Sequence, residues 1–161
     1  MKNYFELFNL PAKFNINLLE VEQKYHRFQN QFHPDKADFS SIEQSILFNE
    51  AYKILSDDFL RASHLLQLKN IDIENDENHI KPDISTLQEI LDLQEKIVEI
   101  DNLHEILELK NNLNSQIKNL ITNFQNAFEA NQIKEATQFL IKAKYLKKSL
   151  IDLKNRQKNL N

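Results

Sequence analysis

No glycine occurs anywhere in the 161 residues of this chain. Glycine-rich phosphate-binding loops are therefore excluded, as are most of the tight turns that close two-residue β-hairpins. Left-handed backbone at turns must come instead from asparagine, which tolerates that conformation next best and is plentiful here. Cysteine is also absent, which excludes disulfides, thiolate metal sites and a cysteine nucleophile.

The first 70 residues have helical periodicity in three segments. Asn3 and Glu6 have the spacing of a capping box and predict a short helix over "YFELFNL". A capping residue at Asn17 predicts a second helix, whose apolar positions are Val21, Tyr25, Phe28 and Phe32. A third helix is predicted to begin at Ser40, with the apolar positions Leu47, Ala51, Ile54 and Leu55.

The rest of the chain begins with a polar, aperiodic stretch, "NIDIENDENHIKPD". It predicts a linker over 71–83 between a domain at 1–70 and a domain at 84–161. Beyond it we expect a helix capped by Asp83 or Ser85 that runs to about Ile100, and two long helices separated by the turn "EANQ". Short connections make neighbouring helices antiparallel, so these three form a bundle. No segment predicts a strand, and the fold class is all-α.

Charge is divided unevenly along the chain. Residues 1–70 are nearly balanced, residues 71–110 carry 12 acidic against 3 basic side chains, and residues 111–161 carry 3 against 9. This division favours helices that attract one another over a nucleic-acid surface. No apolar run is long enough to span a bilayer and no signal peptide is visible, so we expect a cytoplasmic protein unless a targeting segment was removed.

The segment "RFQNQFHPDKADFSS" places a proline between His33 and Asp35, where the second helix should end. Pro34 fixes one backbone angle and holds the corner in a single shape. Asp35 can then present a rigid acceptor to a cation. Two other interpretations remain open: a turn cap made by Asp35, and a catalytic pair, although no nucleophile or pocket motif accompanies it.

This "HPDK" corner, followed by "FNEAYKILSD", resembles a J-domain, the module of DnaJ-type co-chaperones, over roughly residues 2–69. The resemblance implies a helical hairpin with a short flanking helix, and a surface that docks on an ATP-dependent heat-shock chaperone of the HscA/DnaK type. The residues it implies for chaperone binding are Lys24, His26, Arg27, His33, Pro34, Asp35 and Lys36. The chain departs from the usual pattern at Gln31, where J-domains often carry lysine.

The segments "NYFELFNLPAKFNIN" and "DDFLRASHLLQLKNIDI" resemble the HscB type of J-protein, which extends the resemblance to nearly the whole chain. It implies an L-shaped protein in which a C-terminal three-helix domain binds an IscU-like iron–sulfur scaffold. The residues it implies for scaffold binding are Leu87, Gln88, Leu91, Asp92, Glu95 and Tyr145. Gln88 departs from the apolar residue that relatives often carry there.

The helix after the linker carries two apolar strips. At 100° per residue, Ile90, Leu93, Ile97 and Ile100 lie between about 220° and 300° from Leu87, which makes an ordinary core stripe. Leu87, Leu91 and Val98 lie within about 40° of one another, and together the strips exceed the width that a surface helix needs. Either this helix is buried on two sides, for example by the J-domain, or it exposes an apolar patch to a partner.

Other kinds of site find little support. The five histidines lack metal-ligand spacing, so we expect no metal or cofactor in this chain. "KAKYLKK" is more typical of a solvated helix face than of a nucleic-acid site. We therefore expect a non-enzymatic adaptor that stimulates the chaperone's ATPase and delivers the scaffold to it. The alternatives are a J-domain co-chaperone with another client and a purely structural helical interaction protein.

Overall fold

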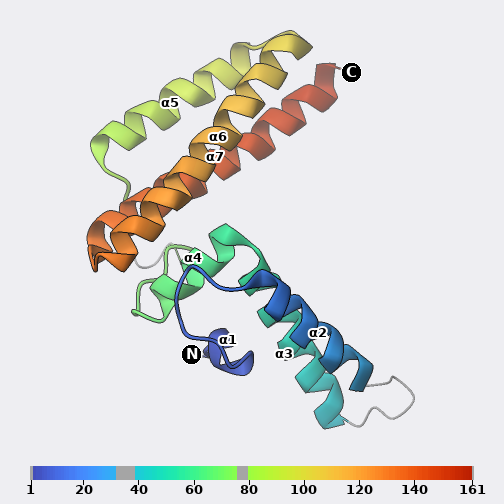
Figure 1. The fold of residues 1–161 in the computed structure, drawn as a ribbon. Helices are drawn as coiled ribbons and strands as arrows, with labels where there is room; N and C mark the ends of the chain where they lie inside the picture. The colour runs from blue at the N-terminus through green and yellow to red at the C-terminus, as the bar shows by residue number, and fades with distance from the viewer. Residues whose placement is uncertain (1, 32–38, 76–79, 161) are drawn as a thin grey trace. The chain divides into compact units, whose positions relative to one another are not determined.

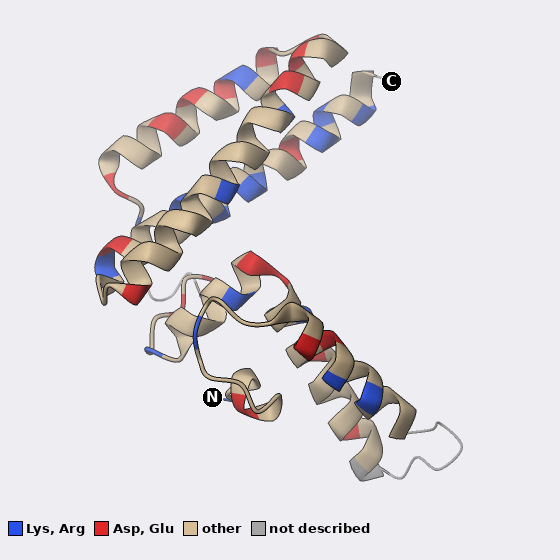
Figure 2. Cartoon of the chain, in the orientation of Figure 1, with Lys and Arg blue, Asp and Glu red and all other residues tan. Residues whose placement is uncertain are grey.

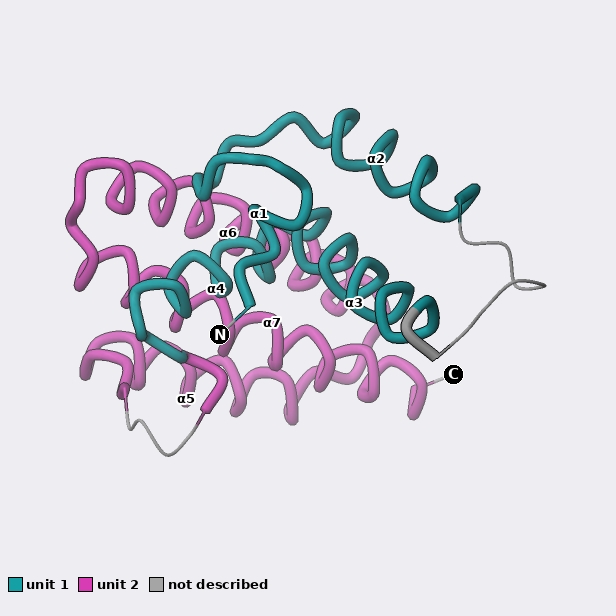
Figure 3. Tube along the Cα trace, turned by 90° about the horizontal axis from the view of Figure 1, so that it is seen from below, with its two compact units in different colours: residues 1–72 teal, residues 73–161 magenta. Residues whose placement is uncertain are grey.

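The computed structural model describes residues 2–31, 39–75 and 80–160, and the regular elements in those ranges are all helices (Figure 1). The chain divides into two compact units, residues 1–72 and 73–161 (Figure 3). The first unit contains α1 (Tyr4–Leu7), α2 (Leu18–Gln31), α3 (Phe39–Ser56) and α4 (Asp58–Gln67). The second contains α5 (Ile84–Glu99), α6 (Leu103–Glu129) and α7 (Ile133–Leu160). The predicted all-α fold is confirmed.

Helix starts follow the predicted caps. Asn3, Asn17 and Asp83 each accept a hydrogen bond from a backbone N–H in the first turn of a helix, at 3.1, 3.3 and 2.7 Å respectively. The hydrogen bonds from the backbone and side chain of Thr86 lower the pKa of Asp83, against a small effect of burial, and Lys142 adds to the lowering. The third helix begins at Phe39, one residue before the predicted cap Ser40.

Helix ends in this glycine-free chain use asparagine. Asn9, Asn70 and Asn131 have φ values of 49°, 62° and 58°, and among the described residues only these three have positive φ. Each lies two or three residues beyond the last residue of a helix and donates its N–H to the carbonyl three residues before it. The next residue donates five residues back, as in the Schellman motif; after α6 the bonds are 3.0 and 2.8 Å. The prediction that asparagine replaces glycine at turns is confirmed.

Aromatic side chains hold the helices of the first unit together. Phe28 of α2 stacks on Phe48 of α3 with 3.7 Å between ring centroids, and Tyr25 stacks on Tyr52 at 4.1 Å. Phe8, which follows α1, lies against the Phe48 ring at 5.5 Å. Tyr25 and Phe28, two of the apolar positions predicted for α2, therefore contact α3, whereas their partners Phe48 and Tyr52 lie beside the predicted apolar positions of α3 and are not among them.

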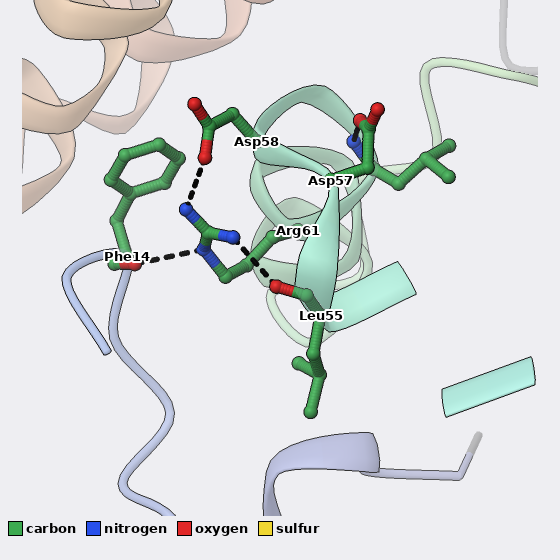
Figure 4. A network of polar contacts seen from close by, with 6 residues as sticks. Phe14, Leu55, Asp57, Asp58 and Arg61 are labelled. Carbon is green, nitrogen blue, oxygen red and sulfur yellow. Dashed lines mark hydrogen bonds and ion pairs between the residues drawn. The ribbon is translucent and has the colours of Figure 1, made fainter. Parts of the chain in front are cut away.

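Arg61 of α4 connects three segments of the first unit (Figure 4). Its side chain is buried; Nε donates to the carbonyl of Phe14 (2.9 Å), Nη1 to the carbonyl of Leu55 (2.6 Å) and Nη2 to a carboxylate oxygen of Asp58 (2.5 Å). The guanidinium also lies 4.6 Å from the centre of the Phe14 ring. The loop before α2, the end of α3 and the start of α4 therefore share one cation.

His64 joins α4 to α1. The ring is 1% exposed, and its Nε2 accepts a hydrogen bond from the backbone N–H of Tyr4 (3.2 Å). An acceptor at Nε2 requires the neutral imidazole. Burial lowers the pKa of His64 below its usual 6.5, and the side chain of Gln67 opposes that shift. The Tyr4 ring lies 4.7 Å from the His64 ring, and burial together with a hydrogen bond to Glu50 of α3 raises the pKa of Tyr4 to about 12.

The second unit is a three-helix bundle. Helix α6 runs antiparallel to α7 (Figure 1). Helix α5 runs parallel to α7, because Gln138 donates to the carbonyl of Lys81 just before α5 and Arg156 donates to the carbonyl of Ile100 at its end. The core between the helices includes Ile97 and Ile100 of the stripe predicted for α5. The other members come from α6 and α7: Ile106, Leu109, Leu113, Ile117, Leu146 and Leu153.

Helix α7 also holds part of the predicted linker. Nζ of Lys144 donates to the carbonyl of Ile73 (2.7 Å), and Nε2 of Gln138 reaches the carbonyl of Lys81 at 3.2 Å. Pro82 is buried. Both described ends of the predicted linker, at Ile73 and at Lys81, are therefore attached to the bundle.

We expect Asn131→Ala to lower the free energy of unfolding by about 1 kcal/mol, because alanine does not tolerate the left-handed backbone at φ 58°. Asn131→Gly should change it much less, since glycine removes the strain but also raises the entropy of the unfolded chain. Urea unfolding followed by circular dichroism measures both. Equal stability of the alanine and wild-type proteins would contradict this account of the turn.

A second prediction concerns pH. Because the folded state lowers the pKa of His64 below 6.5, the free energy of unfolding should be highest above that pH and fall as the pH drops below it. His64→Gln should reduce this slope between about pH 7.5 and 5.5, where carboxylates contribute little. The matched control is His104→Gln, because the His104 side chain is 83% exposed. The prediction fails if the two variants show the same slope.

Candidate functional site

The corner predicted for chaperone binding lies between two described helices. Helix α2 ends at Gln31 and α3 begins at Phe39. The predicted residues His33, Pro34, Asp35 and Lys36 lie outside the described residues. Their role therefore stays a prediction, and what the structure adds is the arrangement of the cations on α2.

The three predicted cationic residues of α2 differ in what they contact. Nζ of Lys24 donates to the carbonyl of Phe8 (2.7 Å) and pairs with Glu20 at 2.6 Å, so this ammonium connects α2 to the end of α1. The side chain of His26 is 60% exposed and lies 3.8 Å from Glu22. Arg27 is exposed. His26 and Arg27 therefore face solvent, while the charge of Lys24 is engaged within the unit.

A pocket of about 240 Å³ lies beside Arg27. Its lining combines aromatic rings with polar and cationic side chains from the α1 region, α2 and α3: Leu7, Phe8, Asn9, Lys24, Arg27, Phe28, Gln31 and Phe48. The α2 surface next to the corner is thus both basic and partly apolar.

On α5 the two predicted strips have different environments. Ile90, Ile97 and Ile100 are buried in the bundle, as predicted for the core stripe. Leu87, Leu91 and Val98 are exposed by 41%, 56% and 72%. Within the second unit, α6 and α7 therefore leave these three side chains uncovered.

Polar residues border this patch. Nε2 of Gln88 donates to Oδ1 of Asp92 (2.9 Å), and both side chains are exposed, as is Glu95. The acidic character of α5 contrasts with the basic α7 in Figure 2. All the predicted scaffold residues except Tyr145 therefore lie on the outer side of one helix.

Tyr145 lies on α7 and is half-buried. It follows by one turn Lys142, whose ammonium forms an ion pair with Glu89 of α5. The structure therefore places Tyr145 on the helix that packs beside α5, near the level of Glu89.

Sequence reasoning missed one exposed residue of α5. Ile84 is 86% exposed at the start of the helix. At 100° per residue it lies about 60° from Leu87, on the same side as Leu91 and Val98. The 100° spacing that aligns Leu87, Leu91 and Val98 also includes Ile84, so the sequence carries the signal for this residue.

Within the described ranges no helix is long and apolar enough to cross a membrane. In the same part of the chain, no three acidic or histidine side chains gather where they could hold a metal ion.

An all-helical chain with an HPD segment between two paired helices, followed by a bundle with an exposed apolar face, has the features of a J-type co-chaperone. A family model described as the HSCB C-terminal oligomerisation domain matches residues 82–154. The co-chaperone protein HscB homolog of Acinetobacter baylyi is 34% identical over 155 residues, covering 94% of this chain and 88% of that protein. The chain belongs to the HscB family of co-chaperones, which serve iron–sulfur cluster assembly.

Solved structures support the same fold. The human co-chaperone protein HscB matches with a TM-score of 0.85 and 26% identity, covering 98% of this chain and 83% of that one. The chaperone HscB from Vibrio cholerae matches with a TM-score of 0.80 and 23% identity, covering 99% and 100%. Both units of the chain are therefore included in the similarity.

We expect Lys24→Met to lower the free energy of unfolding by about 1 kcal/mol, because it removes the bonds to Glu20 and to the Phe8 carbonyl. Arg27→Met, the same kind of change one turn away on an exposed side chain, should alter stability by less than about 0.5 kcal/mol. Urea unfolding compares them. Equal losses in both variants would contradict the structural role of Lys24.

Proposed function

We propose that this protein is an adaptor between an HscA/DnaK-type chaperone and an IscU-like scaffold. The first unit stimulates the ATPase of the chaperone through His33, Pro34, Asp35 and Lys36, together with the basic surface of α2. The second unit binds the scaffold through Leu87, Gln88, Leu91, Asp92, Glu95 and Tyr145. The observation that carries the proposal is the exposed apolar face of α5, which lies in a different unit from the HPD segment.

The two sites need different chemistry. Pro34 restricts the backbone, so Asp35 can offer its carboxylate to a cation of the chaperone with little loss of conformational freedom. Arg27 and His26 on α2 suit an acidic docking surface. The chaperone carries out the hydrolysis, and this chain acts on it as a non-enzymatic partner.

The scaffold site instead depends on burial of apolar surface. Leu87 and Leu91 are each about half exposed in the free protein. Covering what remains exposed contributes about 1 kcal/mol for each side chain, roughly half of the value for burying a fully exposed leucine. A partly exposed tyrosine on a rigid helix, such as Tyr145, is a frequent interface anchor.

Joining the two sites in one chain increases the local concentration of scaffold beside the chaperone. The adaptor therefore needs no contact between scaffold and chaperone to favour their encounter. We place this activity in the cytoplasm, where both proposed partners would be found.

The experiment is single-turnover ATP hydrolysis by the HscA-type chaperone of the same organism, with this protein alone and with the IscU-like scaffold. Stimulation should increase further when the scaffold is present. Asp35→Asn should abolish stimulation and leave scaffold affinity unchanged, whereas Asp38→Asn, the same change outside the tripeptide, should retain stimulation.

The double substitution Leu91→Ala and Tyr145→Ala should raise the scaffold Kd by tenfold or more. Leu107→Ala is its control, because Leu107 of α6 is 50% exposed.

Each result separates the possibilities. Stimulation that the scaffold does not change would indicate a J-domain co-chaperone with another client. Absence of stimulation would indicate a helical interaction protein in which Asp35 only caps a turn. If Asp35→Asn and the α5–α7 double substitution each impaired both activities equally, the division of labour between the units would be wrong.

A further inference from the structure

The exposed apolar residues of α5 form a longer strip than the predicted scaffold site. Its inner members, Leu87 and Leu91, are 41% and 56% exposed. Its outer members, Ile84 and Val98, are 86% and 72% exposed, more than the inner pair. We call Ile84, Leu87, Leu91 and Val98 the α5 strip.

The geometry of a helix places these four residues on one side of α5. At 100° and 1.5 Å per residue, its four members lie within about 60° of one another and extend over about 21 Å. The bundle does not need the outer pair for its own core, since Ile90, Ile97 and Ile100 supply the buried face of the helix. A solvent-facing helix side ordinarily carries polar residues, and four exposed apolar side chains on one side of a helix are typical of a surface that binds a partner.

One side of the strip is acidic. Asp92, Glu95 and Glu99 are exposed and lie between about 80° and 140° from Leu87, beside the apolar members. Gln88 lies on the same side, and its amide is hydrogen-bonded to Asp92. Polar side chains therefore border the middle of the α5 strip. A partner that covers Leu87 and Leu91 gains further apolar contact mainly from Ile84 and Val98 at the two ends.

We propose that Ile84 and Val98 are the end contacts of the scaffold interface, so that the scaffold covers the whole α5 strip with an apolar surface bordered by basic residues. This inference rests on the proposed function and adds two residues to its binding site. A second copy of this chain fits the strip less well, because a symmetric pairing through α5 would bring two acidic borders together.

The test measures scaffold affinity by titration calorimetry with the full chain. Ile84→Ser and Val98→Ser should each raise the Kd for the IscU-like scaffold about five- to tenfold, with chaperone stimulation in the absence of scaffold unchanged. The matched control is Ile151→Ser on α7, where the side chain is 58% exposed; it should leave the Kd unchanged. Circular dichroism and urea unfolding establish that the variants fold alike.

Leu91→Ala is included to separate the two proposals. If it weakens scaffold binding while Ile84→Ser and Val98→Ser match Ile151→Ser, the scaffold site ends before the outer residues and this inference is wrong. If Leu91→Ala has no effect either, the proposed scaffold function itself fails. If the serine variants reduce self-association in sedimentation and leave scaffold binding intact, the strip is an interface between copies, which also overturns the inference.

Discussion

Long basic side chains that donate to backbone carbonyls hold the connections of this protein. Arg61 is the most buried of them, and its guanidinium binds the carbonyls of Phe14 and Leu55 as well as Asp58. Lys24, Lys144 and Arg156 do the same at the end of α1, at Ile73 and at the end of α5. Carbonyls at helix ends lack intrahelical partners and carry partial negative charge, so a cation is a suitable donor. Removing Arg61 would take a donor from the buried carbonyls of Phe14 and Leu55 and the ion-pair partner from the exposed Asp58.

This use of cations affects how the proposed chaperone surface should be interpreted. A count of basic residues on α2 treats Lys24 and Arg27 as equivalent. The ammonium of Lys24, however, is bonded to Glu20 and to the carbonyl of Phe8, whereas the side chain of Arg27 is exposed. Substituting Lys24 would perturb the position of α1 as well as the surface charge. Loss of chaperone binding in such a variant would therefore not by itself identify a contact residue.

The sequence predicted those parts of the structure that depend on local patterns. Period and capping residues predicted the helices except for the break between α3 and α4. The absence of glycine predicted that asparagine would supply left-handed turns, and Asn9, Asn70 and Asn131 do so. The angular positions on α5 distinguished the buried Ile90 from the exposed Leu91. The partners of Arg61 and Lys144 could not be predicted, because a backbone carbonyl has no identity in the sequence and becomes an acceptor only once segments far apart pack together. The role of His64 could not be predicted from the sequence either, because it depends on a hydrogen bond from the backbone N–H of Tyr4, 60 residues earlier in the chain.

The asparagine turns have a consequence for the unfolded chain. Glycine has the largest conformational freedom of any residue and loses the most on folding. A typical chain of this length would contain about 11 glycines, and replacing one by a residue with a side chain, where the native backbone permits it, stabilises by about 0.4–1 kcal/mol. This chain accepts left-handed strain at Asn9, Asn70 and Asn131, and in return no residue of its denatured state has the freedom of glycine. Part of its stability therefore arises because the unfolded chain has fewer conformations to lose. This contribution does not correspond to any contact in the folded protein.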